Sequence, residues 1–259
     1  MTYLTEISSQ HVLTFLLVLV RVLPLALIAP VTGSSHLPAR ARLVLGLLLA
    51  LLIVPLELEK SPVHADTFGG YLVLAGAEAL VGMTLGLGIL LLFASMQVAG
   101  QLISQMSGMQ LAEVFDQATE TNVPAYSHLL SLATIAVFLL IGGHRKIMEA
   151  LLDTFAWMPA GQGMFSRSVF EAACALLTQS FVLGIRAAAP AMVSLLLATL
   201  VLAVISRTLP QLNLLVLGFG INALVGTLVL GASLGAAAWI FQDQVEPFVD
   251  LLLDALRAG

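Results

Sequence analysis

One of the two longest charge-free stretches of the chain is ALVGMTLGLGILLLFASMQVAGQLISQMSGMQLA, at residues 79–112. As a helix rising 1.5 Å per residue it would measure about 50 Å, well beyond a hydrocarbon core of roughly 30 Å. The charge-free run at residues 43–56 would reach only about 20 Å. We therefore expect an all-α membrane protein that is not a row of regular spans, in which some helices are broken and others are too short to cross.

The rest of the chain shares this apolar character. Of its 259 residues, 59% are hydrophobic and only 10% are charged, against about 25% charged residues in an ordinary soluble domain. With 10 Lys and Arg residues and a net charge of −5, the chain has no basic footprint for phosphate groups, which excludes a nucleic-acid binder. The first ten residues carry no Lys or Arg, so we expect no cleaved signal peptide.

Proline and glycine residues mark the expected breaks in the helices. Pro24 and Pro30 lie in the first apolar stretch, Pro190 lies within residues 172–205, and Pro210 opens the last long segment. A proline inside a helix removes a hydrogen bond, and the freed backbone groups need other helices or a wet cavity. We predict kinked, discontinuous helical hairpins.

Three charged residues lie inside or at the start of apolar segments: Arg21, Glu78 and Arg186. Charges at membrane depth are costly and usually face a protein interior or water. One interpretation is an ion or proton path. The other is an ion pair or a contact with partner backbone, and spacing alone does not pair the three residues.

Polar and small residues repeat every four positions near the end of the run at residues 79–112. Gln97, Gln101 and Gln105 form one row, and Gly100, Ser104 and Gly108 form a second row beside it. On a helix both rows lie on one face. They can serve close helix packing, or they can line a water-filled space, and the pattern leaves both uses open.

Three carboxylates, Glu113, Asp116 and Glu120, follow this stripe. Paired carboxylates can act as general acid and base, but no His or Cys cluster accompanies them. We therefore expect no enzyme, no metal site and no cofactor. Met106 and Met109 are flexible enough for a deformable seal, although core filling is the more frequent role of Met.

An amphipathic pattern covers residues 243–257, with Val245, Phe248 and Leu252 on its apolar stripe and acidic residues off it. An acidic helix is poorly suited to an anionic membrane surface. We expect this helix to dock on another subunit.

Four segments, in order along the chain, carry a resemblance to a known family. They are RVLPLALIAPVTGSSHLPARARLVLGLLLALLIVP (21–55), QMSGMQLAEVFDQATETNVP (105–124), GGHRKIMEALLDTFAWMPAG (142–161) and RAAAPAMVSLLLATLVLAVISRTLPQLNLLVLGFGINALVG (186–226). Together they resemble the FliR family of flagellar type III export-apparatus proteins. One departure is Gln117, where the family usually has a proline.

The resemblance implies both an architecture and a function. It implies a FliP-like part over about 1–185 and a FliQ-like C-terminal hairpin over about 186–259, packed into a helical heteromeric assembly. The implied function is that of a core subunit of the flagellar type III protein export gate, in the bacterial inner membrane at the flagellar basal body. The implied partners are FliP-like and FliQ-like gate proteins, an FlhB-like switch protein, an FlhA-like export protein, rod proteins, unfolded flagellar subunits and membrane lipid.

The resemblance also implies sites. In the family a mid-chain loop plugs the closed channel, and this loop corresponds to about Gln105 to Pro124 here. The predicted plug or gate residues are Met106, Gly108, Met109, Leu111, Phe115 and Asp116. Those predicted to line the channel or pack helices are Gln97, Gly100, Gln101, Ser104 and Gln105. Those predicted for turns or subunit contacts are Arg21, Arg186, Arg207, Pro210, Gln211 and Asn213.

Two other functions fit the same features. The chain is equally compatible with the equivalent subunit of a virulence-type injectisome, for which the fold would be unchanged. A small-solute secondary transporter also uses broken helices and midplane charges. In a transporter, Arg186→Ala or Glu78→Ala would abolish substrate binding.

Overall fold

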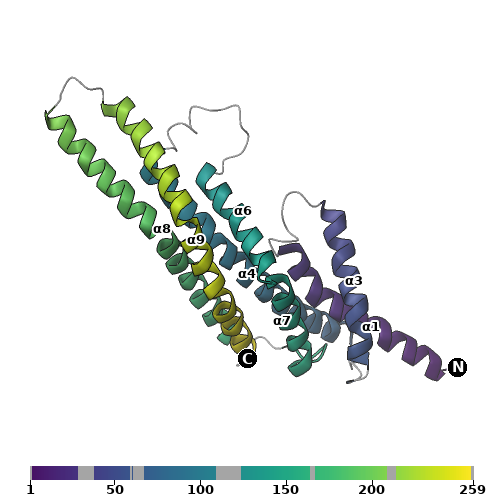
Figure 1. The fold of residues 1–259 in the computed structure, drawn as a ribbon. Coiled ribbons are helices and arrows are strands. Elements are labelled where there is room, and N and C mark those ends of the chain that lie inside the picture. The colour runs from purple at the N-terminus through teal and green to yellow at the C-terminus, as the bar shows by residue number, and fades with distance from the viewer. Residues whose placement is uncertain are drawn as a thin grey trace. The chain divides into compact units, whose positions relative to one another are not determined.

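The computed structural model describes residues 2–28, 38–58, 60, 67–108, 124–163, 167–208 and 214–257. Within these ranges every regular element is an α-helix, which confirms the predicted all-α membrane protein. The described helices are α1 (Thr2–Ile28), α3 (Ala39–Leu58), α4 (Phe68–Ser107), α6 (Ala125–Leu140), α7 (Gly143–Trp157), α8 (Arg167–Thr208) and α9 (Leu214–Arg257) (Figure 1).

The helices differ widely in length, as the uneven apolar runs predict. Five described helices are long and apolar enough to cross a membrane, and α6 with α7 would make a sixth if they form one broken span. α4 is continuous over 40 residues and would measure about 60 Å, twice the hydrocarbon thickness. Pro24, Pro55, Pro190 and Pro247 lie inside helices rather than at their ends.

The described contacts divide the chain into two compact units. The first comprises residues 1–91, 142–177 and 246–259, and the second comprises residues 92–141 and 178–245. α4, α8 and α9 each contribute one part to each unit. The predicted division into a FliP-like and a FliQ-like part is a statement about similarity to other proteins. The two compact units do not test it, and it stays a prediction.

In the first unit, small residues let α1 approach its neighbours closely. A Cβ added at Gly82 of α4 would collide with the backbone carbonyl of Arg21, and one at Gly86 would lie 3.0 Å from Ile28 Cβ. These two glycines have the small-xxx-small spacing that permits close helix packing. On the other side of α1, a Cβ at Gly46 of α3 would lie 3.4 Å from Ala26 Cβ.

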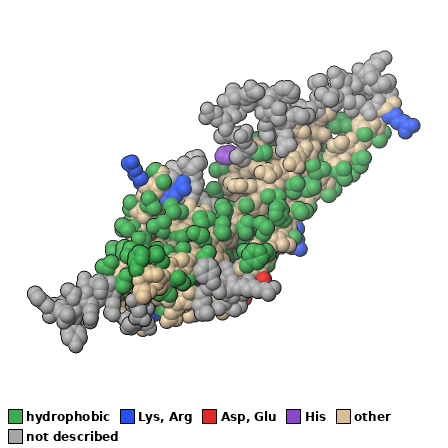
Figure 2. Space-filling view, turned by 180° about the vertical axis from the view of Figure 1, so that it is seen from behind, with side chains coloured by type: hydrophobic (Ala, Val, Ile, Leu, Met, Phe, Trp, Pro, Cys, Tyr) green, Lys and Arg blue, Asp and Glu red, His purple; other side chains and the backbone are tan. Residues whose placement is uncertain are grey.

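The outer side of α3 is left open within the chain. Only one stripe of this helix is buried, at Gly46, Ala50, Ile53 and Glu57, while Leu52 is 71% exposed. Apolar side chains cover much of the described surface in Figure 2, and charged side chains are few there. Apolar surface of this extent marks contact with lipid or partner protein.

Aromatic side chains form the centre of the second unit. The Phe93 ring meets Phe138 and Phe241 edge to face, with centroids 5.1 and 5.6 Å apart. Glycine again permits close packing, because a Cβ at Gly184 of α8 would lie 2.6 Å from the carbonyl oxygen of Ser95 of α4.

The C-terminal amphipathic stripe is buried in its own chain. Val245, Phe248 and Leu252 are at most 2% exposed. In the first unit, a Cβ at Gly88 of α4 would collide with the Leu252 side chain. The expectation that this stripe docks on another subunit was wrong, because the apolar surface that it needs is supplied by the chain's own helices.

Candidate functional site

The glutamine row, defined as Gln97, Gln101 and Gln105, is exposed along its whole length on α4. The neighbouring small residues Gly100 and Ser104 are buried. The two rows therefore differ in exposure: the amide side chains are exposed, and the small residues beside them are buried.

α6 covers the small-residue row. A Cβ at Gly100 would collide with the backbone of Ser127, and the Ser127 hydroxyl donates a 3.0 Å hydrogen bond to the carbonyl oxygen of Gln97. The close approach of α4 and α6 thus requires a residue without a side chain at position 100. The glutamine side chains remain free for contacts outside the chain.

The exposed stripe of α4 changes chemistry along its length. Met83, Leu87 and Leu90 are each at least 40% exposed, and the glutamine row continues the same stripe toward the C-terminal end of the helix. One end of this stripe therefore suits lipid or apolar protein, and the other suits water or hydrogen-bonding groups.

α4 ends at the start of the predicted plug. Gly108 follows the helix with a φ of 76°, and its N–H donates to the carbonyl oxygen of Gln105 at 3.3 Å. A left-handed residue after a helix is usually glycine, because other residues pay a steric cost there. Met106 is half-buried. The predicted plug residues Met109, Leu111, Phe115 and Asp116 lie outside the described residues.

A charge cluster, defined as Arg21, Glu57, Lys60 and Glu78, lies in the first unit, and all of its members except Lys60 are buried. Arg21 and Glu78 have no exposed side-chain surface, and the Arg21 Nε donates to Glu78 Oε2. Two of the three predicted intramembrane charges are thus a buried ion pair. Since charges at this depth need a partner, the pair explains why both residues are tolerated there.

The Arg21 guanidinium also binds the end of α7. Its Nη1 donates to the carbonyl oxygens of Met158, at 2.9 Å, and Thr154, at 3.3 Å. Its carbon lies 4.2 Å from the centroid of the Phe155 ring. The Thr154 carbonyl also accepts the Met158 N–H, and both carbonyls lie at the end of the helix that carries partial negative charge, so a cation stabilises them.

The carboxylates of the cluster bind the turn that follows α7. Glu78 Oε1 accepts the Gly161 N–H at 2.8 Å, and Glu57 Oε2 accepts the Ala160 N–H at 2.9 Å. Lys60 donates to Glu57 at 2.8 Å and to the Phe155 carbonyl oxygen at 3.0 Å. Cations therefore bind the carbonyls and carboxylates bind the N–H groups, which fastens this turn to α1, α3 and α4.

The remaining predicted contact residues lie elsewhere. Arg186 and Arg207 are exposed on α8. Pro210, Gln211 and Asn213 lie outside the described residues. Arg21 itself is buried and bonded within the chain.

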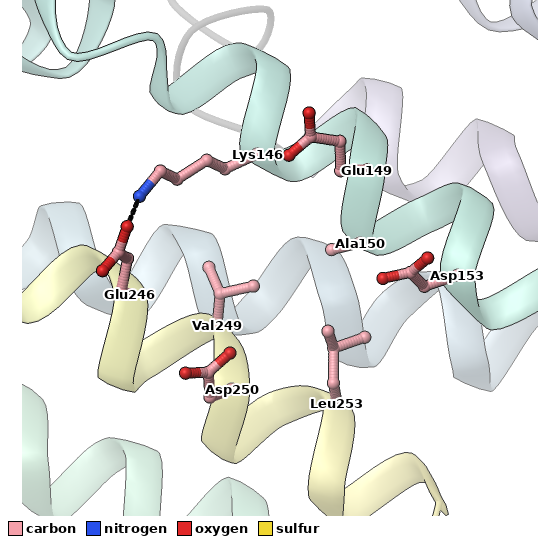
Figure 3. A pocket seen from close by; sticks show the side chains of 8 residues that line it. All are labelled: Lys146, Glu149, Ala150, Asp153, Glu246, Val249, Asp250 and Leu253. Carbon is pink, nitrogen blue, oxygen red and sulfur yellow. Dashed lines mark hydrogen bonds and ion pairs between the residues drawn. The ribbon is translucent and has the colours of Figure 1, made fainter.

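An open acidic groove of about 250 Å³ lies between α7 and α9 in the first unit. No sequence pattern predicted this groove. Lys146 reaches across it to Glu246, and Asp153 and Asp250 lie along it over an apolar floor that includes Leu253 (Figure 3). Among the described residues, no three His, Cys, Asp or Glu side chains are placed to hold a metal ion.

Comparison with known proteins places the chain in a family. The family model described as "Bacterial export proteins, family 1" matches residues 12–248. The flagellar biosynthetic protein FliR of Pectobacterium carotovorum subsp. carotovorum is 32% identical over 92% of this chain and 90% of that protein. The chain belongs to the FliR family of bacterial export proteins. The FliR proteins of Escherichia coli K12 and Aquifex aeolicus are 28% and 30% identical, over 97% and 93% of this chain and the same shares of those proteins.

Membership in the FliR family describes the chain in general terms. It is a membrane component of the flagellar export apparatus, and it acts together with other flagellar export components. Members of the family are structural components of that apparatus, and the family is not a known class of enzymes. The match includes the charge cluster and the glutamine row.

Proposed function

We propose that the chain is a core subunit of the flagellar type III export gate in the bacterial inner membrane. In this role it helps form and seal the channel through which unfolded flagellar subunits cross, and the rod assembles on the complex. The observation that carries the proposal is the exposed glutamine row, which runs along α4 to the start of the segment 109–123 in a member of the FliR family.

The chemistry of the glutamine row suits a conduit for unfolded chains. An amide both donates and accepts hydrogen bonds, so it can replace water for a passing backbone. It carries no charge, so it holds neither acidic nor basic side chains tightly. The buried row beside it anchors α4 on α6, which keeps the amides in register along the wall.

The seal is assigned to the segment that follows α4. Met106, Met109, Leu111 and Phe115 are apolar, and Gly108 supplies a left-handed residue at the end of the helix. Hydrophobic constrictions can close a pore to ions by excluding water. Asp116 completes the predicted gate residues and lies at the polar edge of this apolar set in the sequence.

The open apolar surfaces are assigned to neighbours in the complex. FliP-like and FliQ-like subunits and lipid cover the exposed leucines, and FlhB-like and FlhA-like proteins associate with this core. The exposed side chains of Arg186 and Arg207 suit contacts with partner carboxylates or carbonyls. Pro210, Gln211 and Asn213 follow Arg207 in the sequence, and a turn that makes a subunit contact is the role proposed for them. A FliP-like part over about 1–185 and a FliQ-like hairpin over about 186–259 would fit such packing.

Deletion of residues 108–116 tests the seal. In cells that carry the complete gate, the deletion should raise the resting efflux of K⁺ across the inner membrane. Replacing Met109, Leu111 and Phe115 together by serine keeps the segment's length and should have the same effect, because it removes the apolar barrier.

Two polar changes in the same segment are the matched control. Glu113→Gln and Glu120→Gln alter charge without removing apolar surface, so K⁺ efflux should stay at the wild-type rate. An unchanged efflux after the deletion, in gates shown to be assembled by co-purification of the partners, would refute the sealing role.

A further inference from the structure

An exposed arginine, Arg186, interrupts the apolar stretch of α8. That stretch runs from Ala173 to Ile205, 33 residues, and would measure about 50 Å. It would have to tilt by roughly 53° to fit a hydrocarbon core of about 30 Å, whereas membrane helices tilt by about 0–40°. Part of the stretch must therefore lie outside the hydrocarbon.

Two exposed arginines enclose a part of α8 that has the length of one membrane crossing. Arg186 and Arg207 are exposed, and residues 187–206 between them carry no charge. At 1.5 Å per residue this segment spans about 30 Å, the thickness of a hydrocarbon core. The segment before Arg186, residues 173–185, would span only about 20 Å.

The open face of the segment 187–206 suits acyl chains. Its described hydroxyl groups are satisfied within the helix, because Ser194 and Thr199 each donate at 2.9 Å to a carbonyl oxygen of α8. Its exposed large side chains are all aliphatic: Val193, Leu196, Leu197, Leu200, Val201 and Val204. Lipid can therefore cover this face without leaving a polar group unpaired.

The backbone at Arg186 needs water or another donor. Pro190 lies inside α8 and has no N–H, so it cannot donate to the Arg186 carbonyl oxygen four residues before it. An unpaired carbonyl is costly in hydrocarbon, whereas water satisfies it at the membrane surface. The arginine side chain and the freed carbonyl thus favour the same wet level.

Hydrogen bonds within the second unit set the register of α8 and α9. Gln179 of α8 donates to Gln244 of α9 at 3.3 Å, and Asn222 of α9 donates to Thr199 of α8 at 3.3 Å. The two helices, side by side in Figure 1, are therefore antiparallel. In this register Arg186 lies level with about position 236 of α9.

The chemistry of α9 changes at that level. Trp239 lies within one helical turn of it and is 66% exposed. Tryptophan concentrates at membrane surfaces, because its ring is apolar and its N–H is polar. The α9 residues 214–242 carry no charge, and the exposed Asp243 follows them. Both helices thus pass from apolar to polar character at one level.

We propose that residues 187–206 of α8 cross the hydrocarbon core in contact with acyl chains, and that Arg186 and Trp239 lie at one membrane surface, where the Arg186 guanidinium binds phospholipid phosphate oxygens. Arg207 has the same role at the other surface. Partner carboxylates would suit each arginine singly, but the spacing of the two matches the two phosphate layers of a bilayer. Exposed apolar side chains before Arg186, such as Phe181, then lie outside the hydrocarbon. This placement goes beyond the proposed function and does not depend on the seal.

Spin labels at two matched positions test the placement. In a Cys174→Ser background, Leu197→Cys puts a label midway between the arginines, and Phe181→Cys puts one about 7 Å before Arg186. The two native side chains are apolar and 57% and 51% exposed. The full chain, co-purified with cysteine-free partners, is reconstituted in bilayers of phosphatidylethanolamine and phosphatidylglycerol. The label at 197 should collide with dissolved oxygen and be shielded from a water-soluble nickel chelate, whereas the label at 181 should be open to the chelate.

Substitution of Arg186 tests its role at the membrane surface. Arg186→Leu joins the apolar runs on its two sides, so the label at 181 should lose its access to the chelate. Arg186→Lys is the matched control, because lysine also carries a cation on a long side chain that reaches the phosphates. In this variant the label at 181 should keep its access.

Three results would overturn the inference. A label at 197 that is shielded from both oxygen and the chelate would mean that protein, and not lipid, covers this face of α8. Equal chelate access at 181 and 197 would mean that Arg186 does not lie at the membrane surface. Unchanged access at 181 in Arg186→Leu would mean that the arginine does not set the level of that surface.

Discussion

The buried ion pair predicts a large and specific loss of stability in the variant Glu78→Gln. The variant has nearly the same shape, but it leaves the Arg21 guanidinium buried without a counter-charge. Glutamine has one side-chain oxygen, so it can accept from the Arg21 Nε or from the Gly161 N–H, whereas the carboxylate accepts from both. One buried donor is then left unpaired.

The magnitude follows from the complete burial of both side chains. Removing one partner of a buried pair costs about 3–5 kcal/mol, which includes the uncompensated charge. The remaining contacts of Arg21, to two carbonyl oxygens and the Phe155 ring, do not replace a carboxylate. At about 2–4 °C per kcal/mol for a chain of this size, the apparent Tm should fall by roughly 6–20 °C.

The assay is the thermal stability of the full chain, co-expressed with its partners and kept in mild detergent. The apparent Tm is the temperature at which half of the monodisperse peak is lost in size-exclusion chromatography. Glu149→Gln is the matched control, because it breaks a helical ion pair with Arg145 whose side chains are 82% and 58% exposed. Exposed helical pairs contribute about 0.3–0.5 kcal/mol, so this Tm should move by less than about 2 °C.

A second substitution separates the lost charge pairing from general damage. Adding Arg21→Met to Glu78→Gln removes the uncompensated cation, so the double variant should recover part of the lost Tm. A Tm change for Glu78→Gln as small as that of Glu149→Gln would refute the reasoning. The single variant Arg21→Met is measured alongside, and a double variant whose Tm loss equals the sum of the two single losses would show that the two charges are not coupled.

Two further changes probe packing and lining on α4. Gly82→Ala should lower the apparent Tm by several degrees, because a Cβ there collides with the α1 backbone. Gly76→Ala should not lower the Tm, because its Cβ would meet open space. Equal Tm losses for the two variants would contradict the close approach of α1 and α4. The second change uses a Cys174→Ser background, which removes the native exposed cysteine. Gln101→Cys should crosslink to an export substrate stalled in the gate, and Leu87→Cys should not, although both positions are exposed. Equal crosslinking at the two positions would contradict the lining role of the glutamine row.

The position of the glutamine row on one helix face was predictable from the sequence, but its exposure was not. A period of four places both rows on one helix face, and the sequence left packing and lining as equal possibilities for both. In the structure, Gly100 meets Ser127 of α6, while Gln101 beside it stays open. That division depends on where a helix beginning at residue 125 crosses α4, and no local pattern encodes the crossing.

The charge cluster shows the same dependence. The cost of a charge in an apolar segment singles out Arg21 and Glu78 from sequence alone. Their pairing joins residues 57 positions apart, and it also requires the end of α7 and the following turn to deliver carbonyl and N–H groups to them.

The amino-acid sequence alone is enough to establish the class of this protein. Its long apolar runs require helices in an apolar environment, and its four motifs in order identify the family. Which apolar and polar faces meet within the chain depends on how distant helices pack, as the burial of Phe248 and Leu252 shows. Hydrophobicity measures only how strongly a helix face avoids water. Lipid, a partner subunit and the chain's own helices all keep water away from that face, so hydrophobicity alone does not say which of them covers it.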